Sequence, residues 1–102
     1  SKKLKYFIQV NIAKEIQKSG VQEEDLNELI NFCRKVDLNV IGLMCIPPAN
    51  KETESYFEEM NKLNNGLGLK ELSMGMSGDY LEAIRYNATY VRVGSKIFGI
   101  RD

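Results

Sequence analysis

The sequence contains no histidine, no tryptophan and only two cysteines among its 102 residues. A metal site is therefore not expected, because the nitrogen and sulfur ligands typical of zinc are too few. The missing histidine also removes the commonest general base, and no nucleophile–base pair is visible among the remaining residues. Cys33 and Cys45 each lie in an apolar run, which favours buried free thiols and a reducing compartment such as the cytoplasm.

An excess of one charge and long apolar runs are absent as well. Lysine and arginine together number 14, as do aspartate and glutamate, so the formal net charge is zero. This balance argues against an extended basic surface, and no apolar run approaches the ~20 residues that span a bilayer. We therefore expect neither nucleic acid nor a membrane among the partners. The length of 102 residues allows one domain at most, so residues 1–102 are treated as one unit.

Four runs rich in β-branched and aromatic residues alternate with segments of helical periodicity. The runs are nearly all apolar, as parallel strands covered on both faces should be. This repeating pattern is typical of an α/β fold with a parallel sheet. We expect strands over 5–12, 40–46, 71–76 and 89–94, and helices over about 23–36, 53–63 and 79–86.

Alternation along the expected strands separates an apolar face from a face with polar or small residues. Asn11 lies on the polar face of the first strand, Gly75 on that of the third and Arg92 on that of the fourth. The apolar faces are expected to pack on helices. The other face should line an interior that becomes polar towards the carboxyl ends of the strands, where α/β barrels build their sites.

Two segments at strand ends have the composition of a phosphate cradle. The run 75–79 combines two glycines with Ser77 and leads into a helix, so backbone amides and a hydroxyl are available to an anion. Its simpler interpretation is that Ser77 or Asp79 only caps the helix. The run 92–95 combines a cation, a glycine and a hydroxyl, and its simpler interpretation is a strand end with a surface arginine. Together they are a stronger signal, because the phosphate site of a barrel commonly forms after its last two strands.

At these residues the chain resembles a known family. The blocks Gln9-Val10-Asn11-Ile12, Leu72-Ser73-Met74-Gly75-Met76-Ser77 and Val91-Arg92-Val93-Gly94-Ser95 occur in that order and span nearly the whole chain. They resemble the pyridoxal phosphate (PLP) homeostasis family, also called YggS-like or PROSC-like, a short relative of the alanine racemase barrel. The resemblance implies that residues 1–102 are the C-terminal half, with four strands, of a PLP-binding (β/α)8 TIM-type barrel.

The resemblance also implies a function and a set of cofactor-binding residues. Members of the family are thought to buffer and deliver PLP without enzymatic turnover, and the lysine that binds the cofactor covalently belongs to the N-terminal half. Residues expected to meet the phosphate, the ring or the pocket wall in this chain are Asn11, Met44, Gly75, Met76, Ser77, Arg92, Gly94 and Ser95. Two alternatives stay open: half of a PLP-dependent racemase-like enzyme, and a half-barrel fragment that binds nothing.

Four parallel strands cannot close into a barrel. We therefore expect open edges at 5–12 and 89–94, and an inner face without a partner layer. An open strand edge favours pairing with another chain. The expected partner is the N-terminal half of the barrel or a second copy of this chain.

Overall fold

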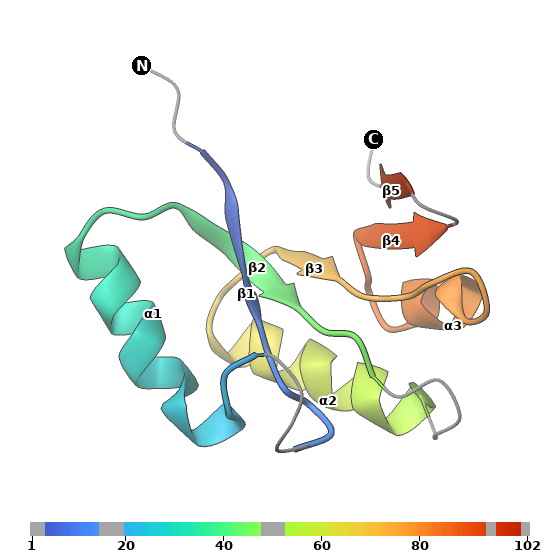
Figure 1. Ribbon diagram of the computed structural model, residues 1–102, viewed down its shortest axis with the longest axis horizontal. Coiled ribbons are helices and arrows are strands. Elements are labelled where there is room, and N and C mark those ends of the chain that lie inside the picture. The colour runs from blue at the N-terminus through green and yellow to red at the C-terminus, as the bar shows by residue number, and fades with distance from the viewer. Residues whose placement is uncertain (1–3, 15–19, 48–52, 94–95, 101–102) are drawn as a thin grey trace.

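A computed structural model describes residues 4–14, 20–47, 53–93 and 96–100. Its core element is a five-stranded sheet with the order β1-β2-β3-β4-β5, and the helices lie along one face of that sheet (Figure 1). The strands are β1 Tyr6–Gln9, β2 Val40–Met44, β3 Glu71–Ser73, β4 Tyr90–Val93 and β5 Lys96–Gly99. The helices are the 3-10 turn η1 Glu23–Asp25, α1 Leu26–Lys35, α2 Thr53–Gly66 and α3 Tyr80–Arg85.

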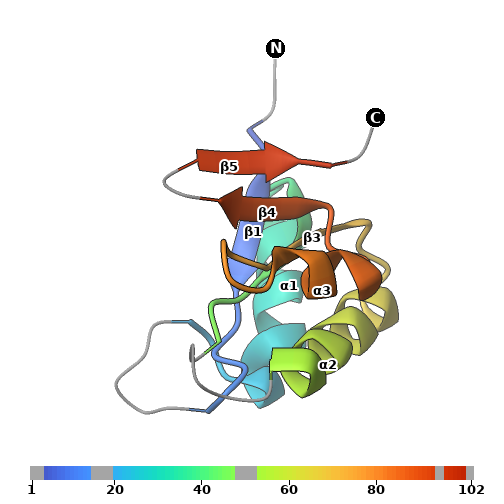
Figure 2. The ribbon, with the colours of Figure 1, turned by 90° about the vertical axis from the view of Figure 1, so that its right-hand side faces the viewer.

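The sheet is mixed rather than parallel throughout. Strands β1 to β4 are parallel to one another, as the sequence predicts. A fifth strand, β5, was not predicted, and it pairs antiparallel with β4 over all four of its residues. Figure 2 shows β5 alongside β4, on the side away from the helices. The expectation of four strands with an open edge at 89–94 is therefore wrong, because β5 takes up the hydrogen-bonding groups of that edge.

The opposite edge is also shorter than predicted. The amide of Asn11 donates to the carbonyl of Val21 at 2.8 Å, and the amide of Val21 donates to the carbonyl of Gln9 at 2.9 Å. These two bonds form an isolated parallel bridge between Val10 and Val21. The carboxyl end of β1 is thus covered by a segment of the same chain, and the exposed backbone of this edge is confined to the first part of the strand.

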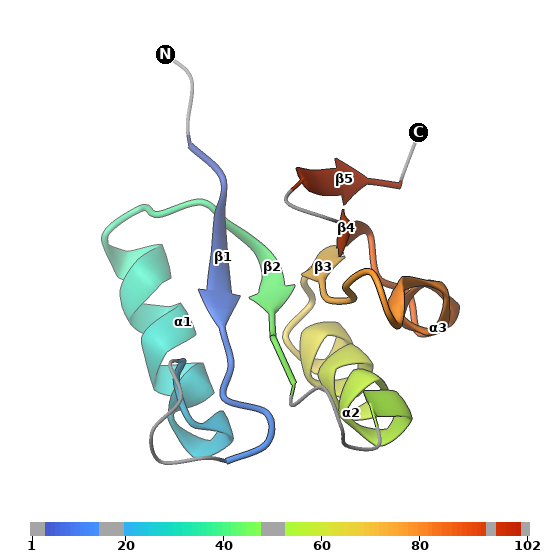
Figure 3. The same cartoon turned by 45° about the vertical axis from the view of Figure 1, so that its right-hand side comes forward.

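Burial follows the predicted alternation along the strands. The face that packs on the helices is apolar, and these side chains, together with those from α1, α2 and α3, form one core. Figure 3 shows the ribbons of these three helices beside the strands. None of the helices in the described ranges is long and apolar enough to cross a bilayer. The buried apolar residues are Ile8, Val10, Ile12, Leu26, Ile30, Cys33, Leu43, Cys45, Phe57, Met60, Leu72, Met74, Ala83, Ala88 and Val91.

The other face of the sheet is partly covered by its own aromatic side chains. The rings of Phe7 on β1 and Tyr90 on β4 meet edge to face, with 5.2 Å between their centroids. Strands β2 and β3 lie between these two strands, so the contact requires the sheet to curl towards this face. Gly42 lies buried beneath the Phe7 ring, whereas Ile46 is exposed. The inner face of the sheet was predicted to lack a covering layer. This prediction is wrong for the part of the face where the Phe7 and Tyr90 rings meet.

Helix α2 continues three residues past the end predicted for it at Leu63. Asn64, the first residue beyond that predicted end, is buried at 3% exposure. Its Oδ1 accepts the amide of Leu43 at 3.0 Å, and its Nδ2 donates to the carbonyl oxygens of Leu69 and Glu71 at 3.2 and 2.9 Å. One amide side chain thus joins the end of α2 to the backbones of β2 and β3.

A pair of carboxyl groups joins η1 to α2, and it makes stability depend on pH. A hydrogen bond that the protonated Glu23 carboxyl donates to Glu59 raises the pKa of Glu23, and partial burial and the charge of Glu59 raise this pKa further. A raised pKa in the folded state gives stability that is complete below the unfolded pKa and is lost as pH rises through the folded value. We expect Glu23→Gln to increase the free energy of unfolding at pH 7 by roughly 0.3–0.5 kcal/mol, the scale of a solvent-exposed charge pair.

Urea unfolding at pH 7.0 and pH 4.0 tests this expectation. The gain should vanish at the lower pH, where the carboxyl pair already holds a proton. Glu28→Gln on the exposed face of α1 is the matched control, and it should not reproduce the gain expected for Glu23→Gln at pH 7. A gain for Glu23→Gln that is independent of pH would contradict the role assigned to the pair.

Candidate functional site

A small cavity of about 100 Å³ lies at the carboxyl ends of β2, β3 and β4. This is the end of the sheet at which the sequence predicts a site. The backbone after β3 forms one wall, and β4 and β5 form another. The lining residues are Met44, Cys45, Ile46, Ser73, Met74, Gly75, Met76, Arg92 and Ile97.

The cavity brings together four of the eight residues predicted to bind a cofactor: Met44, Gly75, Met76 and Arg92. Ser77 lines a separate, more open hollow of about 290 Å³ between the start of α2 and α3. Asn11 is buried at the end of β1 and does not line the cavity. Gly94 and Ser95 lie outside the described residues.

Gly75 has a structural reason to be glycine. Its φ is +105°, and a Cβ at this position would lie 2.6 Å from the Cβ of Ala83 and 3.3 Å from a methyl group of Val91. The absence of a side chain lets α3 pack directly against the chain leaving β3. The carbonyl of Gly75 also accepts the amide of Arg92 at 2.8 Å. The result is a close approach of the two strand ends that frame the cavity.

Asp79 closes the turn that follows Gly75. Its Oδ1 accepts the amide of Met76 at 2.7 Å, and its own amide donates to the carbonyl of Met76 at 3.0 Å. Asp79 stands at the N-cap position of α3, but its side chain makes no capping hydrogen bond to the helix and accepts the Met76 amide instead. Because this amide already has an acceptor, an anion in the cavity would share it with the carboxylate or displace that carboxylate.

The electrostatics of the cavity have opposing contributions. Arg92 lines the cavity and reaches solvent, so it supplies a positive charge. Burial and, to a smaller extent, the charge of Asp79 together raise the pKa of the Cys45 thiol to about 12. Cys45 is therefore a neutral wall residue at physiological pH rather than a nucleophile.

Within the described part of the chain, no three histidine, cysteine, aspartate or glutamate side chains are grouped to hold a metal ion.

Sequence reasoning missed several lining residues. Ser73 had a signal, because it shares a strand face with Gly75. Ile46 had one too, because it shares a face with Met44. Ile97 had none, because β5 was not predicted and its residues carry no polar or glycine pattern pointing to a site.

Comparison with known proteins assigns the family. The model of the alanine racemase N-terminal domain matches residues 1–102. The chain belongs to this family. It is 41% identical over 110 residues to the pyridoxal phosphate homeostasis protein of Vibrio alginolyticus, covering 99% of this chain and 47% of the relative. The corresponding protein of Aquifex aeolicus is 39% identical over 105 residues, covering 93% and 46%.

A solved structure gives the same result. PipY of Synechococcus elongatus PCC7942 with PLP bound has a TM-score of 0.74 and 31% identity, covering 89% of this chain and 47% of PipY. The structure of PipY without PLP has a TM-score of 0.73 at 28% identity. The chain thus spans about half the length of the curated relatives it matches.

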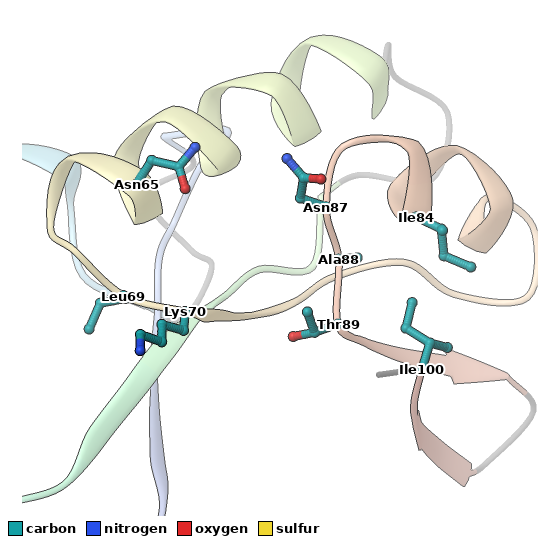
Figure 4. A pocket seen from close by; sticks show the side chains of 8 residues that line it. All are labelled: Asn65, Leu69, Lys70, Ile84, Asn87, Ala88, Thr89 and Ile100. Atoms are coloured by element: carbon teal, nitrogen blue, oxygen red, sulfur yellow. The ribbon is translucent and has the colours of Figure 1, made fainter. Parts of the chain in front are cut away.

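A groove of about 550 Å³ lies at the opposite end of the sheet. Figure 4 shows Asn65 from α2 and Asn87 from the turn after α3 at its rim, with Thr89 below them. The polar groups at this groove already make contacts within the fold: Asn87 donates to Asn61, and the Thr89 hydroxyl accepts the amide of Leu72. No residue predicted to bind a cofactor lines it, so the candidate site is the cavity at the carboxyl ends.

Proposed function

We propose that this chain binds the phosphate of PLP at the carboxyl ends of β3 and β4 and thereby takes part in PLP homeostasis. The observation that carries the proposal is the cavity itself, which unites Gly75 and Met76 after β3 with Arg92 on β4. Relatives over the whole chain are pyridoxal phosphate homeostasis proteins, and PipY has been seen with PLP bound. Backbone amides, a hydroxyl and a guanidinium are the donors that suit a phosphate.

Some of the predicted residues are proposed to bind the phosphate, and others to form the wall of the pocket. Ser77 and the amides near Gly75 and Met76 hold the phosphate from one side, and Gly94 and Ser95 from the other. Arg92 neutralises the phosphate or faces the pyridine ring, and the pocket wall comes from Asn11 and Met44. When bound, PLP supplies an electron sink. We propose that no turnover accompanies binding, because the sequence has no histidine and Cys45 stays a thiol.

The volume of the cavity limits what this chain holds by itself. Pockets for small molecules are typically ~300–1,000 Å³, so a cavity of about 100 Å³ suits a phosphate rather than the whole cofactor. We propose that residues 1–102 form the C-terminal half of a (β/α)8 barrel in the cytoplasm. The other half, in the same polypeptide or in another chain, would then complete the pocket and provide the lysine that binds PLP covalently. Relatives of twice the length and four parallel strands support this arrangement.

Replacing Ser77 by aspartate tests the phosphate site. Position 77 directly follows Met76, which lines the cavity, so a carboxylate there should repel an anion bound at the proposed site. We expect the dissociation constants for inorganic phosphate and for PLP to rise at least tenfold, which corresponds to about 1.4 kcal/mol. Equilibrium dialysis with phosphate and an absorbance titration with PLP measure the effect. Ser55→Asp, on the exposed surface of α2, adds the same charge away from the cavity and should change neither constant.

A companion variant should have the opposite effect on phosphate and PLP binding. Asp79→Asn keeps an oxygen acceptor for the Met76 amide and removes the negative charge near the cavity, so binding should tighten. Failure of the parent chain to bind phosphate or PLP, or equal binding by Ser77→Asp and the parent, would overturn the proposed site.

A further inference from the structure

Asp79 places a negative charge on a backbone donor of the candidate site. Its Oδ1 accepts the amide of Met76 at 2.7 Å, and its own amide donates to the carbonyl of Met76 at 3.0 Å. Met76 lines the cavity, and its amide is one of the donors proposed to hold the phosphate. An anionic oxygen on a backbone amide is the contact that a phosphate would make there. The carboxylate of Asp79 therefore occupies a position that the phosphate needs.

The same carboxylate has a second set of donors within reach, which it does not use. Asp79 is the N-cap residue of α3, and its side chain makes no hydrogen bond to the amides of that helix. Aspartate is a preferred N-cap residue because its carboxylate accepts the amide of the second or third helical residue, here Leu81 or Glu82. The carbonyl of Asp79 accepts the amide of Ala83 at 3.1 Å. The helix thus already begins at Asp79, so moving the carboxylate to its first turn requires only a local rotation at this residue.

Electrostatic repulsion gives the carboxylate a reason to move. Its charge is felt at the cavity wall, where it adds to the effect of burial in raising the pKa of the Cys45 thiol. A phosphate on the Met76 amide would bring a second negative charge next to the first, and like charges at such a separation disfavour each other strongly. Arg92 lines the cavity, and its single positive charge cannot neutralise both anions. The amides of α3 offer the carboxylate an alternative partner.

We propose that Asp79 sets the affinity of the site for phosphate by exchanging between two partners. Its carboxylate binds the Met76 amide in the absence of an anion, and it binds the amide of Leu81 or Glu82 when phosphate is bound. The inference rests on the proposed function, because it takes the cavity at the carboxyl ends of β3 and β4 as the phosphate site. Binding then requires the Asp79–Met76 contact to break, so the apparent affinity is reduced to the fraction of chains in which this contact is already open. The returning carboxylate favours release of the phosphate, as delivery of a cofactor requires.

Amide hydrogen exchange in α3 tests this change of partner. Inorganic phosphate is added to the 102-residue chain at constant ionic strength, and exchange at single amides is followed by NMR. We expect the amide of Leu81 or Glu82 to exchange about fivefold more slowly at saturation, the effect of a gained aspartate cap. The midpoint should equal that of the chemical shift changes at Gly75 and Ser77. Phosphate binding that leaves exchange at Leu81 and Glu82 unchanged would overturn the inference and leave the proposed function standing.

Asp79→Ala removes the carboxylate from both of its positions. Phosphate should bind this variant about tenfold more tightly, because the Met76 amide is released beforehand and the repelling charge is gone. Phosphate should also no longer slow exchange at Leu81 or Glu82. Asp25→Ala is the matched control, because Asp25 is the exposed N-cap residue of α1, likewise makes no side-chain cap bond and does not line the cavity. It should change neither the phosphate affinity nor the response of α3.

The outcomes separate this inference from the proposed function. Equal or weaker phosphate binding by Asp79→Ala, in a chain whose parent binds phosphate, contradicts the role of Asp79 alone. Slowed exchange in α3 that persists in Asp79→Ala does the same, because no carboxylate is then present to form the cap. Absence of phosphate binding by the parent contradicts the proposed function and the inference with it. If Asp79→Ala does not fold, the exchange measurement on the parent decides, because it needs no substitution.

Discussion

Replacing Gly42 by alanine should lower the free energy of unfolding by about 3 kcal/mol or more. A Cβ at this position would lie 1.9 Å from the carbonyl oxygen of Glu71 and 2.5 Å from its carbonyl carbon. Both atoms belong to the backbone of β3, so no change of side-chain rotamer relieves the clash. Strands β2 and β3 would have to separate where Gly42 is paired with Glu71. Urea unfolding followed by circular dichroism measures the loss.

Gly66→Ala is the matched control for this change. It adds the same methyl group at the last residue of α2, where nothing lies within 4 Å of the new atom. Alanine is favoured over glycine in a helix by up to ~1 kcal/mol, so this variant should be neutral or more stable. An unchanged unfolding midpoint for Gly42→Ala, or an equal loss in both variants, would show that the sheet does not depend on the close approach at Gly42.

The alternation of side chains along the parallel strands was predictable because burial imposes it directly. Leu43 is fully buried in the core, whereas its neighbours Gly42 and Met44 belong to the other face, where Met44 lines the cavity, as the spacing of two residues requires. Strand β5 was not predicted, because burial imposes no such alternation on it. Ile97 and Phe98 are both exposed, so no alternation marks this strand, and only its pairing with β4 makes it one.

The function of a glycine was harder to predict than its position. Gly75 is predicted to let an anion approach the backbone, and the structure gives it a packing role, because the missing side chain lets α3 approach. Both requirements remove the same side chain, so sequence alone cannot separate them. Asn64 has the same difficulty: asparagine near a helix end predicts termination from local preference, and its three long-range hydrogen bonds override that preference.

Asn64→Asp should destabilise the chain by about 3 kcal/mol or more at pH 7, the scale of a buried charge left without a partner. The substitution keeps an oxygen that accepts the Leu43 amide. It replaces the donor to Leu69 and Glu71 with a second oxygen, which then faces two carbonyl oxygens at the 3.2 and 2.9 Å now spanned by hydrogen bonds. Urea unfolding at several pH values measures both the size of the loss and its pH dependence.

The sign of that dependence follows from burial. The new carboxyl is desolvated beside carbonyl oxygens, which raises its pKa in the folded state above the ~3.9 of an unfolded aspartate. The penalty therefore grows as pH rises from that value through the folded pKa, and stability recovers in acid, where the neutral carboxyl can donate to one carbonyl. Asn65→Asp, one residue further and exposed, adds the same charge at the end of α2 and should cost only ~0.3–1 kcal/mol against the helix dipole. Equal losses at the two positions, or a loss for Asn64→Asp that persists unchanged in acid, would mean that the three hydrogen bonds of Asn64 do not hold α2 against β2 and β3.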